Sequence, residues 1–458
     1  MTSFTLRKQA SKLVLAIALA TGTAMVAGHI APDEAHAQRK KKKDKKDKDA
    51  GKPQYSKEFV AAFTALDEAS KAEGADIPAL RSRLDEIFAM ATSGDEKFQS
   101  GLLAYNMGVK DNNLELRLLG METMLASGKT PPESVGQYNF IAFQTASVLE
   151  QHEKSRDYLQ KAIDLGYSGD GTQSDLLVAM AQTYFNTDEY PRGLQYLDQA
   201  IAAKKAAGEP VEERLFDIAF SVSYREDLQP QVYDYAVARA QMFPTDANWT
   251  NAINVVRVLN EYGPQPTLDI LRLSRMVGVL DDKQEYIIYV ETADARRLPQ
   301  EVKDVIEQGY AIGAIERDDT YISDQLRIAN ERIPVDREEL PALEADARAA
   351  DASFATVRAA GSAFLSYGEF AKAVEFYQKA LGLAGGDTGE TLTRLGIAQV
   401  GLEDYDAAQA TLAKVTGDRA PIAKVWAGYA GYLGADSASA ASADAAAPAT
   451  EAVADAAS

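Results

Sequence analysis

The 458-residue sequence predicts an all-α fold, an α-solenoid of tandem helical hairpins between two disordered termini. Three observations predict it. Apolar residues recur at helical spacing, turns recur about every 36 residues, and small residues recur at matching places in several segments. Two helices in a repeat of this length are typical of helical-repeat arrays, in which each hairpin buries its apolar face against its neighbours.

Residues 367–381 show the helical spacing most clearly. Their apolar side chains are Phe370, Ala373, Val374, Tyr377, Ala380 and Leu381. Steps of three and four residues place these side chains on one face of an amphipathic helix. Such a helix cannot bury its apolar face alone, so we predict that it forms a hairpin with the preceding residues 356–367.

The pattern returns at nearly constant intervals along the chain. Tyr405 follows Phe370 by 35 residues, and Tyr190 precedes Phe370 by five intervals of 36. This interval predicts further turns at residues 110–113, 150–155, 225–230, 260–266, 296–301 and 331–336, where polar residues or proline interrupt the helical pattern. We therefore predict nine hairpins at residues 97–433, preceded by a helical cap at residues 56–96.

Small residues recur where the two helices of a hairpin should meet. Gly361 and Gly396 lie in first helices, whereas Ala373, Ala380 and Ala408 lie in second helices. Small side chains at these places let two helix backbones approach closely. Larger side chains such as Phe364 and Tyr377 are predicted to fill the remaining space.

These units resemble tetratricopeptide repeats (TPR). In that family the first helix carries a Leu-type residue, a small one and an aromatic one, and the second carries a small residue, an aromatic or aliphatic one and Ala. The matching residues are Leu177, Ala181, Tyr184, Gly193, Leu197 and Ala200 in one unit, and Val357, Gly361, Phe364, Ala373, Tyr377 and Ala380 in another. The units between residues 210 and 348 keep the period but lose most of the small residues, so a looser type of helical repeat stays open there.

The first 37 residues have the pattern of a secretory signal peptide. Basic residues precede a run of 16 apolar or small residues, and an A-x-A motif ends at Ala37. Cleavage between Ala37 and Gln38 predicts an exported protein of bacterial type, periplasmic or secreted. No later segment of the sequence is long and apolar enough to predict a membrane-spanning helix.

The two ends of the mature chain are predicted to be disordered. Residues 38–55 form a basic linker, in which residues 39–49 hold eight Lys or Arg and three Asp. This run is either a solvated linker or makes weak electrostatic contact with an anionic membrane surface. Residues 434–458 are rich in Ala and lack aromatic residues, so they are predicted to be a disordered tail.

Little in the sequence points to catalysis. The chain has no cysteine, which excludes disulfides, thiol nucleophiles and cysteine-based metal sites. His152 is the one histidine after residue 37, and it lies in a predicted turn. No phosphate-binding or dinucleotide-binding glycine motif is present. We therefore expect no catalytic residue, cofactor or metal, and the formal net charge of −20 argues against nucleic acid as a partner.

Three functions remain open at this stage. The preferred one is a scaffold that binds a peptide or protein partner in a concave groove, in assembly or maintenance of the cell envelope. The alternatives are a carboxylate-dependent envelope enzyme that acts on glycans and a structural protein of the cell surface. Because the chain is strongly acidic, we expect the partner of the scaffold to carry a basic segment.

The TPR resemblance also implies where a groove would lie. In that family the groove side of each first helix carries one residue just after the small one and another near the end of the helix. The positions in this sequence are Gln182, Phe185, Asn186, Asn251, Glu291, Asp294, Arg327, Asn330, Arg358 and Ser362. Polar side chains of both signs and one aromatic ring are typical of a surface that recognises peptides.

Overall fold

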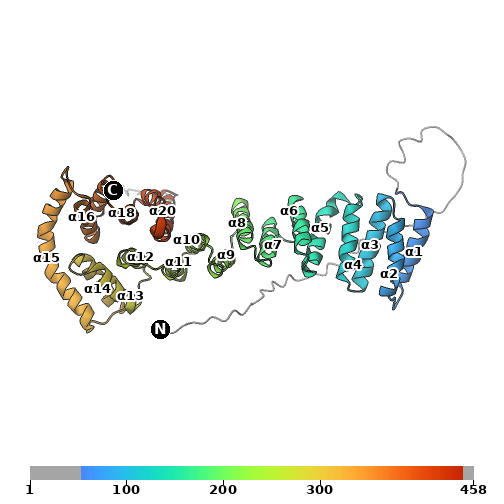
Figure 1. Ribbon diagram of the computed structural model, residues 1–458, viewed down its shortest axis with the longest axis horizontal. Coiled ribbons are helices and arrows are strands. Elements are labelled where there is room, and N and C mark those ends of the chain that lie inside the picture. The colour runs from blue at the N-terminus through green and yellow to red at the C-terminus, as the bar shows by residue number, and fades with distance from the viewer. Residues whose placement is uncertain (1–52, 447–458) are drawn as a thin grey trace, which may run out of the picture. The chain divides into compact units, whose positions relative to one another are not determined.

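The computed structural model describes residues 53–446, and helices make up all of the regular structure in this range (Figure 1). The predicted all-α helical-repeat fold is thereby confirmed. None of the helices in the described part of the chain is long and apolar enough to cross a membrane. The predicted signal peptide, the cleavage position at Ala37 and Gln38, and the basic run at residues 39–49 lie outside the described residues.

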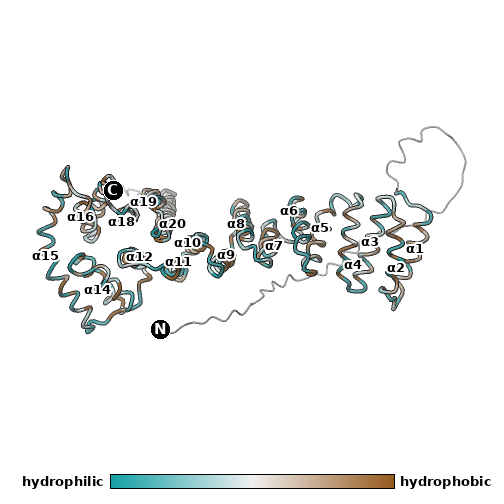
Figure 2. The backbone as a smooth tube through the Cα atoms, viewed as in Figure 1, coloured by the Kyte–Doolittle hydropathy of each residue, from teal (hydrophilic) through white to brown (hydrophobic). Residues whose placement is uncertain are grey.

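The first nine helices pack in chain order, each against the next. Their bounds are α1 Lys57–Lys71, the 3-10 turn η1 Pro78–Leu80, α2 Arg81–Met90, α3 Gly94–Lys110, α4 Leu114–Ala126, α5 Pro132–Val148, α6 His152–Asp164, α7 Gln173–Phe185, α8 Tyr190–Ala207 and α9 Glu213–Arg225. Most helices have both hydrophobic and hydrophilic stretches (Figure 2). Their buried apolar residues form successive small clusters between neighbouring hairpins.

The helices from α10 onward form what we call the C-terminal ring, because the last helix packs back against the first. Their bounds are α10 Gln231–Met242, α11 Asp246–Val258, α12 Pro264–Val277, α13 Lys283–Ala293, α14 Pro299–Ile312, α15 Thr320–Arg348, α16 Phe354–Ser366, α17 Phe370–Leu381, α18 Thr388–Gly401, α19 Tyr405–Leu412, the turn η2 Gly417–Arg419 and α20 Ala420–Ala446. Helix α20 contacts α10, α11 and α12, and α18 contacts α12 (Figure 1). We call this set of contacts the seam.

A single apolar core joins the two sides of the seam. Trp249 of α11, Phe364 of α16 and Trp426 of α20 are all buried in one cluster. The indole of Trp426 donates a hydrogen bond to the backbone carbonyl of Asp269 in α12, at 2.9 Å. Residues about 160 positions apart in the sequence thus share one core. The period of the repeats alone carries no information about this closure.

Several hairpin turns use the same backbone conformation at the same place. Asn112, Glu150, Asp188 and Glu403 have φ values of 51°, 56°, 60° and 63°. Gly368 occupies the equivalent place in the α16–α17 turn, with φ 71°. Left-handed backbone is costly for most residues and free of strain for glycine. The predicted turns at residues 110–113, 150–155, 225–230, 260–266 and 296–301 each overlap the connection between two helices, and each range also extends into one of those helices.

The predicted turn at residues 331–336 is wrong. Helix α15 runs without interruption from Thr320 to Arg348 and contains both Pro334 and Pro341. From α3 to α19 the described chain therefore forms eight hairpins, with one long helix in place of the ninth. Proline removes a helical hydrogen bond but does not have to end a helix that is stabilised on both sides of it.

Ion pairs and burial provide that stabilisation in α15. Arg332 bonds to Asp336 at 2.9 Å and to Glu339 at 2.7 Å, so these pairs span Pro334. Ala329 and Leu340 are buried on either side of the same proline. The segment also lacks glycine, which would have marked a stop. Figure 2 shows α15 as a largely hydrophilic helix.

Residues 434–446, the first part of the predicted tail, belong to a helix in the structure. Helix α20 continues through this stretch to Ala446, and the hydroxyl of Ser437 donates to the carbonyl of Leu433 at 2.8 Å. Alanine has the highest helix propensity of all residues, so a helix that starts in the core can extend through an Ala-rich segment at little cost. The remaining residues of the tail, 447–458, lie outside the described part.

Glycines allow close helix contacts within the hairpins. A Cβ atom on Gly361 would lie 2.9 Å from the Tyr377 ring, and one on Gly396 would lie 2.4 Å from Leu412. Between α3 and α4 the approach involves the backbones themselves, because a Cβ on Gly120 would lie 2.6 Å from the carbonyl oxygen of Gly101. Any larger residue at these places would force the two helices apart.

Glu96 fixes the chain before α1 to the start of α3. Its buried carboxylate accepts hydrogen bonds from the backbone amides of Ser56 at 2.8 Å, Thr92 at 2.8 Å and Ser93 at 2.9 Å. Ser93 in turn caps α3, and its hydroxyl donates to the carbonyl of Gln54, in the predicted linker, at 2.7 Å. Burial raises the pKa of the Glu96 carboxyl, but these hydrogen bonds lower it to about 2.

Candidate functional site: an arginine-lined pocket

The C-terminal ring contains a pocket of about 450 Å³ among α12, the turn before α14, α15, α16 and α18. This volume lies within the range of ligand-binding cavities in proteins, roughly 300–1,000 Å³. Leucine and alanine side chains make the apolar part of its wall: Leu298, Leu340, Leu343, Ala359 and Ala363. The polar part is dominated by arginine: Arg272, Arg296, Arg297, Arg332, Arg358 and Arg394. The only lining carboxylates among the described residues are Asp336 and Glu339.

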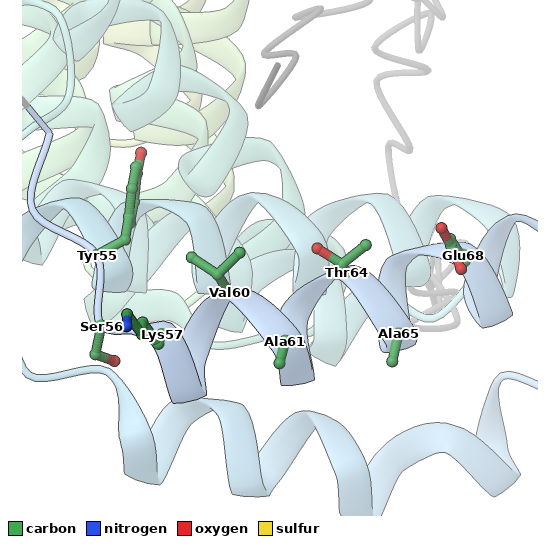
Figure 3. Close-up of a pocket in the computed structure, with 8 residues that line it drawn as sticks. All are labelled: Tyr55, Ser56, Lys57, Val60, Ala61, Thr64, Ala65 and Glu68. Carbon is green, nitrogen blue, oxygen red and sulfur yellow. The ribbon is translucent and has the colours of Figure 1, made fainter. Parts of the chain in front are cut away.

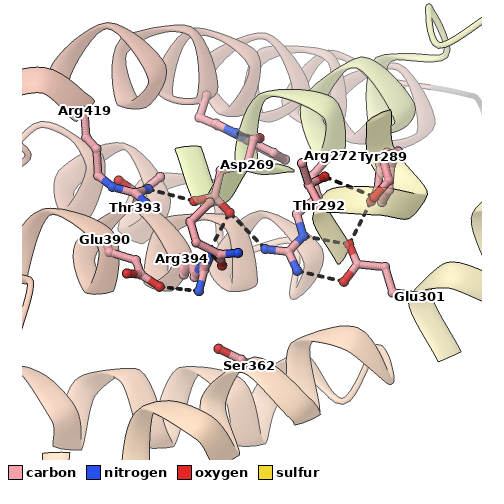
Figure 4. A network of polar contacts seen from close by, with 12 residues as sticks. Asp269, Arg272, Tyr289, Thr292, Glu301, Ser362, Glu390, Thr393, Arg394 and Arg419 are labelled. Atoms are coloured by element: carbon pink, nitrogen blue, oxygen red, sulfur yellow. Dashed lines mark hydrogen bonds and ion pairs between the residues drawn. The ribbon is translucent and has the colours of Figure 1, made fainter. Parts of the chain in front are cut away.

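A buried ionic network at the seam holds one wall of this pocket (Figure 4). Asp269 of α12 has no exposed surface, and its carboxylate accepts from Arg272 at 2.9 Å, from Arg394 at 3.2 Å and from Arg419 at 2.7 Å. Burial alone would raise the pKa of the Asp269 carboxyl. The positive charges of Arg394, Arg272 and Arg419 outweigh that effect and hold the pKa below its usual range.

Glu301 at the start of α14 extends the network on the other side of Arg272. The Arg272 guanidinium donates Nε–H and Nη2–H to the two oxygens of Glu301, both at 2.7 Å. The hydroxyl of Tyr289 donates to the same carboxylate at 2.7 Å. This paired geometry is the strongest arrangement of a guanidinium and a carboxylate. Burial would raise the pKa of the Glu301 carboxyl, but Arg272 lowers it below its usual range.

Arg394 and Arg358 meet at a second carboxylate, Glu390, at the start of α18. Arg394 is 4 % exposed and forms a close ion pair with Glu390, and it also donates to Gln265 at 2.7 Å. Arg358 is more exposed, at 41 %, and its Nη1 lies 3.3 Å from Glu390. Asp269, Glu301 and Glu390 thus compensate the deeper arginines and orient them.

Arg296 and Arg297 differ from the other arginines of the pocket. Both are exposed, and within the described part of the chain neither forms an ion pair. Arg297 donates instead to the backbone carbonyl of Thr292 at 2.7 Å. Although the side chain as a whole is exposed, partial burial of the Arg297 guanidinium lowers its pKa. The positive charges of Arg394 and Arg272 lower this pKa further. The pocket therefore keeps an excess of positive charge inside an acidic protein.

Two of the predicted groove residues line this pocket. Arg358 and Ser362 lie one turn apart on α16, and the Ser362 hydroxyl lies 3.1 Å from that of Tyr377. Figure 4 shows Ser362 on the helix that faces the network. Both residues were chosen from the register of the helix and not because they would line a pocket. Their role in binding stays a prediction.

The predicted groove residues of α7 have local roles in the structure. The Phe185 ring fills the space over Gly193, where an added Cβ would lie 2.2 Å from it, and its centroid is 6.4 Å from that of Tyr190. The Gln182 side chain donates to Asn186 at 2.8 Å. Phe185 therefore packs within its hairpin, whereas Asn186 is exposed at the end of α7.

The other five predicted positions do not line the arginine-lined pocket. Asn251 and Glu291 are exposed on α11 and α13. Asp294 ends α13 with φ 61° and accepts from the backbone amide of Arg296 at 3.0 Å, so it shapes a turn. Arg327 and Asn330 line a second, more open pocket of about 480 Å³ on α15, where Arg327 pairs with Glu331 at 3.0 Å.

A third pocket, of about 560 Å³, lies on the outer side of α1 (Figure 3). Val60, Thr64 and Glu68 follow one another along this side of the helix. It is an open surface with one lining cation, Lys57, and one lining carboxylate, Glu68, so charge is not concentrated there. Nowhere in residues 53–446 do three or more His, Asp or Glu side chains gather as they would around a metal ion.

Arg272, Arg394 and Asp269 were not among the site residues predicted from the sequence. One signal was present, since Asp269 and Arg272 interrupt an otherwise apolar stretch of α12 in which Leu268, Ile270 and Leu271 are buried. Charged residues on such a stretch are buried only when they are paired. Their partners could not be found in the same way, because Arg394 follows Asp269 by 125 residues.

Comparisons with known proteins give little further information. No known family model matches the chain, and no curated protein matches it in sequence. Among solved structures, the chain is similar to one described as the TPR2AB-domain:pHSP90-complex of yeast Sti1. The similarity covers 65% of this chain and 95% of the other, with 15% sequence identity and a TM-score of 0.21. Because this TM-score and identity are low, the description of the fold depends on the helices of this chain and not on the comparison.

Proposed function

We propose that this protein is a non-catalytic helical-repeat scaffold that binds a peptide or protein partner, and that the arginine-lined pocket of the ring is one of its contact sites. One observation carries the proposal. The pocket is walled by side chains from four helices, and a buried ionic network with close hydrogen bonds holds its deepest arginines in place. A contact site that is already ordered loses less entropy when a partner binds.

The setting of this function is also part of the proposal. The signal-peptide pattern of residues 1–37 supports export to the periplasm or beyond, and hence a role in assembly or maintenance of the cell envelope. The acidic composition supports a partner with a basic segment, which would contact the acidic surface outside the pocket. The arginine-rich lining of the pocket favours an acidic group of the partner at that one site.

A pair of tryptophan substitutions on α16 tests the contact site. Ala359 lines the pocket, whereas Ala355 is exposed on the same helix one turn earlier and does not line it. We expect Ala359→Trp to fill the pocket and to weaken binding of the partner at least about tenfold, because contacts in a preformed site depend on shape. Ala355→Trp should bind like wild type.

The measurement has two stages. The partner is first recovered from envelope extract with the wild-type protein, identified by mass spectrometry and purified. Its affinity is then determined by titration for wild type and for both variants, after thermal melting has shown that all three are folded. Equal affinity of Ala359→Trp and Ala355→Trp for the partner would remove the pocket from the proposed function.

A further inference from the structure

The arginines of the pocket fall into two groups by their surroundings. Arg272 and Arg394 are buried and each contacts two carboxylates, so their charge is compensated within the protein. Arg296 and Arg297 line the same pocket, and inside the range 53–446 neither forms an ion pair with a carboxylate. Arg297 donates to the backbone carbonyl of Thr292, but this bond leaves the charge of its guanidinium uncompensated.

The backbone that carries Arg296 and Arg297 is held in place. Asp294 adopts a left-handed conformation and accepts from the Arg296 amide, and the amides of Arg297 and Leu298 donate to the Asp294 carbonyl at 2.8 Å and 2.9 Å. Leu298 is buried under the turn. The two guanidinium groups are therefore presented from a fixed turn, although their ends are exposed.

Concentrating these cations has a cost that the fold offsets for the paired arginines but not for Arg296 and Arg297. Six arginines and two carboxylates line the pocket, and Arg297 has a lowered pKa because it is partly desolvated near Arg394 and Arg272. Like charges at short distance are destabilising unless an opposite charge lies between them. An anion in the pocket would supply that charge.

We infer that the pocket binds a compact polyanion, a ligand that presents two or more carboxylate or phosphate groups on a short carbon framework. Guanidinium groups bind both kinds of oxyanion through paired hydrogen bonds. Arg296 and Arg297 would contact one anionic group, and Arg358, whose Nη1 lies 3.3 Å from Glu390 and which is 41 % exposed, would contact another. Leu298, Leu340 and Leu343 would contact the carbon framework.

This inference rests on the proposed function, because it names the chemistry that the same pocket recognises. Such a ligand has two sources with shared chemistry. It is either a free small polyanion, or a group of acidic side chains presented by the protein partner. The charged lining comes from α12, α15, α16, α18 and the turn before α14. The charged lining is therefore formed by helices from different parts of the ring. It differs in this respect from the predicted groove, which runs along the first helices of successive hairpins.

The test is isothermal titration calorimetry of the full-length mature protein with three probes: citrate, pyrophosphate and a hexaglutamate peptide. Arg296→Gln with Arg297→Gln removes the two unpaired cations and leaves the buried network intact. Arg214→Gln with Arg317→Gln is the matched control, since both arginines are exposed and lie outside the arginine-lined pocket. We expect at least one probe to bind wild type and the control alike, and the first variant about tenfold more weakly or worse.

Each outcome decides the question. Binding of citrate or pyrophosphate that is lost in the first variant only identifies a free polyanion, and binding confined to the peptide with the same loss identifies a partner-borne source. Failure of all probes at low ionic strength, or equal weakening in both double variants, would overturn the inference. In that case the effect of Ala359→Trp on the protein partner would still test the proposed function separately.

Discussion

Asp269→Ala is expected to destabilise the C-terminal ring by about 3–5 kcal/mol, because removing one member of a buried ionic network leaves the other charges uncompensated. Asp269 is the one acceptor shared by Arg272, Arg394 and Arg419. These arginines are at most 9 % exposed, so water cannot replace the lost carboxylate without opening the seam. The loss should therefore appear as unfolding of the ring before the rest of the chain.

The chain provides its own probe for this experiment. Its two tryptophans, Trp249 and Trp426, are both buried in the ring, so tryptophan fluorescence follows the ring whereas far-ultraviolet circular dichroism follows all helices. The matched control is Asp234→Ala, which breaks the more exposed pair with Lys424 across the same seam. An exposed pair contributes less than about 1 kcal/mol. If both variants lowered the fluorescence midpoint equally, Asp269 would not hold the seam.

Glu96→Gln is expected to destabilise the start of the array by about 2–3 kcal/mol at neutral pH. The folded-state pKa of Glu96, about 2, is lower than the usual value of 4.5. A group of this kind stabilises the folded state above its ordinary pKa, and the contribution is lost as pH falls from about 4.5 to about 2. The amide of glutamine keeps the shape but not the charge, so the variant should lack this part of the pH dependence.

Hydrogen exchange measured by mass spectrometry gives a local readout of this change. Peptides that contain the amides of Ser56, Thr92 and Ser93 should exchange slowly in wild type at pH 7 and faster in Glu96→Gln, with the difference shrinking toward pH 3. Glu58→Gln, an exposed carboxylate of the same cap, is the control and should follow wild type. A constant difference between wild type and Glu96→Gln at every pH would contradict the proposed role of the charge.

The local parts of the fold could be predicted because their causes are local. The α16–α17 hairpin follows from the spacing of Phe370, Ala373 and Tyr377, and Gly361 marks the place where its helices meet. The turn at Gly368 follows from a residue that tolerates positive φ. Helix α15 was missed for the converse reason, since the ion pairs that carry it past Pro334 depend on which side chains meet in the folded helix.

The closure of the ring could not be predicted, and neither could the pocket. Both depend on pairs such as Asp269 with Arg394 or Asp234 with Lys424, which are separated by more than 100 residues. The repeat period specifies how each hairpin meets the next, but a small rotation between neighbouring hairpins, added over many units, decides whether the last helix returns to the first. Arg358 and Ser362 were chosen for their register on α16, and only the tertiary fold places them beside Arg296 and Arg297.

The closure of the ring by α20 against α10 accompanies the contact of α18 with α12, two of the helices that line the pocket. Carbodiimide cross-linking with peptide mass spectrometry tests it most directly, because this reagent joins an amine to a carboxylate only where they are in contact. We expect an amide between Lys424 and Asp234, which pair across the seam, as well as one between Lys372 and Glu344, which pair at 2.9 Å between α17 and α15. Recovery of the Lys372–Glu344 product without any Lys424–Asp234 product would show that the ring is open and that α20 does not close it.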